Sequence, residues 1–144
     1  MSDVLDAMQF FKVRNFLLVL MVLVLAILAG TLVPVYLRQR TPQKAFDSYN
    51  RFLLRKEYTR AYAMLIRETR AAGSEESFEL VQQSYTAQHG ALRGYQQGAT
   101  NTHLQDPGLI AIRETLIYEK GSVPFVMLLR KDGLLWEVWG MIEE

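Results

Sequence analysis

The first apolar stretch of the chain runs from Phe16 to Tyr36 and contains no charged residue. A helix of these 21 residues is about 30 Å long, which matches the hydrocarbon core of a bilayer. The pattern predicts one transmembrane helix at residues 16–36, after an N-terminal tail of residues 1–15. A cleaved signal peptide and a buried core helix are the alternatives; the run is long for the first, and the remaining domain is small for the second. Basic residues flank the stretch: Lys12, Arg14, Arg38 and Arg40.

The orientation of this helix has two readings. Arg38, Arg40 and Lys44 closely follow the span, and by count they favour a cytoplasmic C-terminal domain. Long C-terminal domains, however, translocate largely regardless of such counts. We therefore expect a cell-membrane protein with its soluble domain on the extracytoplasmic side, and a cytoplasmic domain is the alternative.

Beyond a polar linker at residues 37–41, apolar residues recur at three- and four-residue spacing and predict three helices. The first begins at Thr41-Pro42, an N-cap followed by proline at the first helical position. The second begins near Tyr58, and the third runs from a Ser74 cap to His89-Gly90. Their expected buried stripes are, in order, Ala45, Phe46, Tyr49, Phe52 and Leu53; Tyr58, Ala61, Tyr62 and Leu65; Phe78, Val81 and Tyr85.

After Gly90 the apolar period changes from 3.6 to 2, which is typical of strands. Turn residues separate four such segments, the last two joined by a tight hairpin at Lys131-Asp132-Gly133. Helices first and strands after predict an α+β domain over residues 42–144, with three helices packed on a curved four-stranded antiparallel sheet. The four segments are residues 91–100, 109–119, 123–130 and 134–144.

The predicted sheet is apolar on both faces, whereas a sheet with one wet face alternates cleanly between apolar and polar residues. Trp136 and Val138 share one parity of the last strand, and Trp139 has the other. Since helices cover only one face, we expect a partner on the other, either a second copy or another membrane-complex subunit. The expected interface residues are Leu135, Trp139, Met141, Val126 and Leu128.

Two segments resemble the nuclear transport factor 2-like superfamily, also called ketosteroid-isomerase-like or cystatin-like. "KEYTRAYAML" is similar to the family's second helix, and "DGLLWEVWGM" to its closing strand. The order of helices and meander over residues 42–144 is similar as well, although the chain lacks room for the hairpin that enzyme members carry between helices two and three. The likeness to compact, membrane-anchored members implies an assembly or scaffold module rather than a catalyst.

Family enzymes use a cone-shaped pocket between helices and sheet. Phe46, Tyr49, Tyr62 and Tyr85 are candidates to line such a pocket, although aromatic residues at helical spacing more often fill a core. His89 and His103 are the only histidines, and neither has a partner at metal-ligand spacing. The chain has no cysteine and shows no nucleophile elbow or phosphate-binding loop. We expect no catalytic residue, no metal and no cofactor.

Charge divides the chain unevenly. Residues 37–70 contain nine basic and three acidic residues, whereas residues 71–144 contain five and ten. The basic part directly follows the membrane span, so anionic lipid head groups could attract it; ordinary solvated helix faces explain it equally well. Nucleic acid is not expected, because the aromatic residues there belong to the apolar stripe. The candidate lipid-facing residues are Arg38, Arg40, Lys44, Arg51, Arg55 and Arg60.

Two functions remain open. The first is a single-pass, membrane-anchored interaction or assembly module that binds a partner, or itself, through the sheet face. The alternative is a membrane-tethered domain that binds a small apolar ligand, or acts on it, in the cone-shaped pocket. The first predicts complexes and no pocket with convergent polar groups, and the second predicts a deep cavity with a buried acid or histidine.

Overall fold

The computed structural model describes residues 2–101 and 106–144, with the backbone alone for residues 2–16. His103 lies outside the described residues. The predicted apolar helix is confirmed as part of α1, Ser2–Gln39. Its segment Leu17–Gln39 contains an 18-residue stretch with a mean hydropathy of 2.8 and is long and apolar enough to cross a membrane. The chain divides into two compact units, Met1–Leu37 and Arg38–Glu144, and the second carries every other element.

Four helices lie between α1 and the strands, where the sequence predicted three. The additional helix is α4, and none of its residues is buried. Because its sequence "RETRAA" has no apolar stripe, hydrophobic periodicity does not reveal it. The helices are α2 (Pro42–Leu54), α3 (Tyr58–Ala63), α4 (Arg67–Ala72) and α5 (Glu75–His89).

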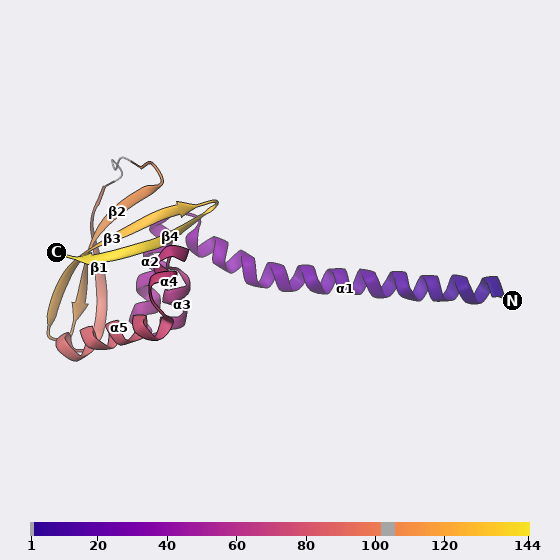
Figure 1. The fold of residues 1–144 in the computed structure, drawn as a ribbon, viewed down its shortest axis with the longest axis horizontal. Helices are drawn as coiled ribbons and strands as arrows, with labels where there is room; N and C mark the ends of the chain where they lie inside the picture. The colour runs from indigo at the N-terminus through magenta and orange to yellow at the C-terminus, as the bar shows by residue number, and fades with distance from the viewer. Residues whose placement is uncertain (1, 102–105) are drawn as a thin grey trace. The chain divides into compact units, whose positions relative to one another are not determined.

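The strands form one antiparallel sheet in the order β1-β2-β3-β4. Helices α2 to α5 gather on one side of this curved sheet (Figure 1), which confirms the predicted α+β class. We call the helix-covered side the inner face and the opposite side the outer face. The strands are β1 (Leu92–Asn101), β2 (Leu109–Tyr118), β3 (Gly121–Asp132) and β4 (Leu135–Glu143).

The main hydrophobic core lies between α2 and the inner face. Phe46 and Tyr49 of α2 are 0% and 2% exposed, and they belong to one buried cluster with Met127 and Leu129 of β3. The segment after α3 closes the free edge of β4, where the Ile66 amide donates to the Val138 carbonyl at 2.9 Å. This pairing covers the β4 edge at Val138.

A β-bulge in β4 changes the face of the sheet on which one predicted interface residue lies. Leu128 pairs with Gly140 and Leu129 with Val138, so Trp139 is an extra residue that shifts the alternation of faces. Beyond the bulge, Met141 lies opposite Met127 on the inner face. Met141 therefore packs inside the domain, and its assignment to the outer, partner-facing side was wrong.

Candidate functional site

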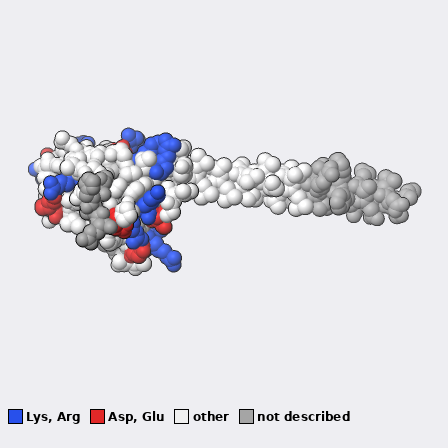
Figure 2. Space-filling view, turned by 90° about the horizontal axis from the view of Figure 1, so that it is seen from above, with Lys and Arg blue, Asp and Glu red and all other residues white. Residues whose placement is uncertain are grey.

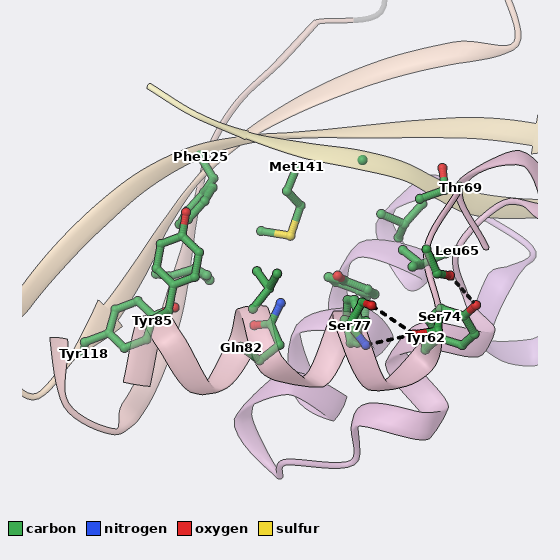
Figure 3. A pocket seen from close by; sticks show the side chains of 17 residues that line it. Tyr62, Leu65, Thr69, Ser74, Ser77, Gln82, Tyr85, Tyr118, Phe125 and Met141 are labelled. Atoms are coloured by element: carbon green, nitrogen blue, oxygen red, sulfur yellow. Dashed lines mark hydrogen bonds between the residues drawn. The ribbon is translucent and has the colours of Figure 1, made fainter. Parts of the chain in front are cut away.

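A cavity of about 420 Å³ separates α5 from the inner face of the sheet. Figure 3 shows Gln82 and Ser77 of α5 on one side of it and Met141 of β4 on the other. The lining contains no charged residue and is mostly apolar or aromatic. It consists of Tyr49, Tyr62, Leu65, Thr69, Gly73, Ser74, Ser77, Phe78, Val81, Gln82, Tyr85, Leu116, Tyr118, Phe125, Val138, Gly140 and Met141.

The cavity exists because α5 does not pack closely on the sheet. None of its residues is buried, although the sequence predicted a buried stripe of Phe78, Val81 and Tyr85. That prediction was wrong: Phe78 and Tyr85 are only half-buried, and Val81 is 52% exposed. Val81 and Gln82 lie in the middle of α5 and line the cavity, and their side chains leave the space beneath the helix unfilled.

Specific contacts hold the N-terminal end of α5. The Ser74 side chain caps the helix by accepting a hydrogen bond from the Ser77 amide. Just before it, the Tyr62 hydroxyl donates to the Gly73 carbonyl at 2.8 Å, and the Tyr62 ring lies 5.9 Å from that of Phe78. These contacts close one end of the cavity.

A cluster of aromatic rings holds the C-terminal end of α5. The Tyr85 ring lies 5.6 Å from Phe125 of β3 and 6.5 Å from Tyr118 of β2. Its hydroxyl donates to a Glu143 carboxylate oxygen at 2.6 Å, and this hydrogen bond, together with burial, raises the pKa of Tyr85 to about 12. Tyr85 therefore stays neutral at physiological pH and acts as a hydrogen-bond donor.

Few polar groups of the lining remain available to a ligand. The Tyr62 and Tyr85 hydroxyls are engaged as described, and the Thr69 hydroxyl donates to the Trp139 carbonyl at 2.7 Å. By contrast, the side-chain amide of Gln82 makes no hydrogen bond to another described residue, although Gln82 lines the cavity. The site thus offers a large apolar surface, and the Gln82 amide and the Tyr49 and Tyr118 hydroxyls are its polar groups without a hydrogen bond to a described residue.

A buried acid lies beyond the cavity wall, beneath α2. Glu114 of β2 is 2% exposed and accepts a hydrogen bond from Asn50 Nδ2 at 2.6 Å. Burial raises its pKa to about 7, and the hydrogen bond from Asn50 opposes that rise. The pKa of Tyr49, which does line the cavity, is raised by burial and then by the nearby charge of Glu114. Glu114 is not among the lining residues, so it acts on the cavity only through neighbours such as Tyr49.

The sequence carries a signal for Glu114, although Glu114 is not among the predicted site residues. Ile112 and Leu116 flank it at the same strand parity, and both are buried. A carboxylate in a row of core positions marks a buried charge or a buried acid. Strand alternation alone was sufficient to find it.

Three of the four predicted pocket residues line the cavity in the structure. Tyr49, Tyr62 and Tyr85 line the cavity, whereas Phe46 does not. Phe46 is fully buried under α2, where its ring meets that of Tyr95 edge-on at 5.8 Å. Tyr118 and Phe125, which lie in the predicted strands but were not predicted to line a pocket, complete the aromatic part of the lining.

The outer face is less apolar than the sequence suggested. Val126, Leu128 and Leu135 are half-buried, and Trp139 is 42% exposed at the bulge. An ion pair of 3.0 Å joins Arg113 on the outer side of β2 to Glu144 beyond β4. Polar groups therefore divide this face, and Ile117 and Ile142 are its other exposed large apolar residues.

In the view of Figure 2, one group of basic side chains on the Arg38–Glu144 unit has few acidic neighbours, whereas basic and acidic side chains are interspersed elsewhere on it. Of the six candidate lipid-facing residues, Arg60 pairs with Glu57 at 2.7 Å. The other five form no ion pair with a described residue. Arg38 and Arg60 both lie over the Phe52 ring, at 5.4 and 5.8 Å from its centroid.

Within the described residues, no group of three or more His, Asp or Glu side chains could hold a metal ion. The chain matches no protein-family model, no curated protein and no solved structure. The cavity, the exposed basic surface and the outer face are therefore the features from which a function can be argued.

Proposed function

We propose that this chain is a membrane-anchored binding domain that takes an uncharged, largely apolar small molecule into the cavity beneath α5. The observation that carries the proposal is the cavity itself. Its volume of about 420 Å³ falls within the range of about 300–1,000 Å³ that is usual for small-molecule sites. The domain would thus act as a carrier or sensor at the membrane rather than as an enzyme.

The chemistry of the lining supports a neutral ligand. No lining residue is charged, so an ionic group inside the cavity would lose its hydration without gaining a partner. The free amide of Gln82 can pair with one polar group of the ligand, while aromatic rings at the C-terminal end of α5 supply apolar contact. The apolar α1 supports a membrane location, where such molecules concentrate.

The resemblance to the nuclear transport factor 2-like superfamily stays part of this proposal. Helices on one face of a curved antiparallel sheet, with a cavity between them, support it. The apolar lining and the absence of charge on it support binding over catalysis.

The full-length protein, purified from its own membrane in a mild detergent, tests the proposal by native mass spectrometry. We expect wild-type protein to retain a small neutral adduct that Gln82→Phe loses, because the new ring fills the cavity. Gln83→Phe is the matched control, since Gln83 is exposed on the neighbouring position of α5 and does not line the cavity. Absence of any adduct from the wild type, or its retention by Gln82→Phe, would contradict the proposal.

A second candidate is the assembly module that binds a partner through the outer face. Trp139 favours it, because tryptophan is a frequent interface anchor and this one is 42% exposed. We expect Trp139→Asp to reduce the size of the complex in detergent while the domain stays folded. Trp136→Asp, which places a charge against the core cluster, should unfold it. An unchanged complex in the Trp139 variant would end this candidate.

A further inference from the structure

Basic residues follow one side of α2 along its whole length. Lys44, Arg51 and Arg55 are spaced seven and four residues apart, so they lie in one row on the helix. This row is opposite the buried side of α2, and both arginines are exposed. The only acidic residue of α2, Asp47, lies off this row and is the acceptor for the Tyr95 hydroxyl at 3.5 Å.

Arg38 and Arg60 extend the row at its side. Both guanidinium groups lie within 6 Å of the centroid of the Phe52 ring, so residues from three segments of the chain gather around one aromatic side chain. We call Arg38, Lys44, Arg51, Arg55 and Arg60 the basic stripe. Arg60 alone has an ion-pair partner among the described residues, namely Glu57.

Elsewhere in the domain, three of the six arginines are neutralised by an ion pair. Arg93, Arg113 and Arg130 each pair with a glutamate. Four of the five residues of the basic stripe therefore carry positive charge that no ion pair among the described residues compensates. Such a surface attracts an anionic partner, and its connection to α1 indicates which one.

Arg38 lies in the last turn of α1, at the end of the segment that is apolar enough to cross a membrane. The stripe therefore begins where the chain leaves the bilayer. We infer that the basic stripe docks the domain on anionic lipid head groups of the membrane that α1 crosses. Juxtamembrane lysine and arginine residues bind negatively charged leaflets additively, and salt weakens this binding. Docking would hold the domain in one orientation on the lipid surface instead of leaving it free on its tether.

The full chain in lipid nanodiscs tests this inference. The chain contains no cysteine, so Ala63→Cys, one helical turn beyond Arg60, gives a single labelling site. Energy transfer from a fluorophore on this residue to a dyed lipid head group reports the distance of the stripe from the lipid surface. We expect about twofold more transfer in nanodiscs with phosphatidylglycerol than in pure phosphatidylcholine, and its loss in about 1 M salt.

Arg51→Glu/Arg55→Glu should abolish the difference between the two lipids. Arg93→Glu/Lys120→Glu is the matched control, because it reverses two exposed charges at the end of the sheet near the C-terminus of α5 and should leave the difference intact. The salt series on the unaltered chain gives a result that does not depend on how the variants fold. Equal transfer in both lipids, or an equal effect of the two double variants, would overturn the inference.

Discussion

Helices α2 and α5 cover neighbouring parts of the same inner face, but they contact it in different ways. The shorter α2, with 13 residues, buries six of them, whereas α5, with 15 residues, buries none. On α2 the residues that meet the sheet are large and continuous along the helix. On α5 the aromatic Phe78 and Tyr85 stand nearer the two ends, with Val81 and Gln82 between them.

The difference shows that an apolar stripe does not by itself determine how closely a helix packs. Phe78 of α5 contacts Tyr62 of α3, Tyr85 contacts Phe125 of β3, and Val81 and Gln82 between them leave the gap beneath the helix unfilled. One part of the inner face is a core that provides stability, and the other is a preformed space. The predictions below are designed to separate these two roles.

The largest difference is expected from removing one ring on each side. Phe46→Ala deletes a fully buried ring beneath α2 and should lower the free energy of unfolding by about 3–5 kcal/mol. Phe78→Ala deletes a half-buried ring that already borders empty space, so we expect a loss below about 1.5 kcal/mol. Urea unfolding of the full chain in mild detergent, followed by tryptophan fluorescence, measures both.

The difference between the two losses in unfolding free energy decides whether α2 and α5 pack differently on the sheet. Equal losses from the two substitutions would mean that α5 packs as closely as α2, and the cavity would then have no part in function. A ligand retained by the protein would add to the contribution of Phe78, so the experiment should be repeated after delipidation.

The elements with strong apolar periods could be predicted from the sequence, and so could the class of the fold. The bulge at Trp139 could not, because it arises from how β4 pairs with β3 rather than from the residues of β4. One extra residue moved Met141 to the opposite face from the one that simple alternation gives. Pairing across strands, which a single sequence does not display, decides such positions.

The cavity was also only partly predictable. Helical spacing correctly brings Tyr49, Tyr62 and Tyr85 to the sheet-facing side, and all three line the cavity. Spacing says nothing of the distance between a helix and the sheet, because that distance depends on which side chains meet. The aromatic contacts of Tyr85 with Tyr118 and Phe125 hold α5 away from the sheet, and they join segments more than thirty residues apart.

One carboxylate of the sheet lies close to each of these two helices, and the two carboxylates differ in their exposure to solvent. Glu143 is exposed and accepts from Tyr85 at the end of α5. Glu114 is buried beneath α2, where Asn50 donates to one of its oxygens. The other Glu114 oxygen and Asn50 Oδ1 are buried without a hydrogen-bond partner among the described residues. A proton on Glu114 supplies the donor that this pair lacks.

The smaller predicted effect follows from the raised pKa of Glu114. Its value of about 7 in the folded domain lies above the ordinary 4.5 that applies when the chain is unfolded. Between these two values the folded state binds the proton more tightly, so the free energy of unfolding should fall as the pH rises from 4.5 to 7. The expected loss is about 2–3 kcal/mol, and below pH 4.5 this contribution is fully retained.

Glu114→Gln should remove this part of the pH dependence, because glutamine resembles the neutral acid and does not titrate. Glu143→Gln is the control and should keep the slope, since Glu143 is exposed to solvent. Unfolding measured at several pH values compares the three proteins, and the same slope in Glu114→Gln as in the wild type would show that the charge of Glu114 is accommodated beneath α2 without cost.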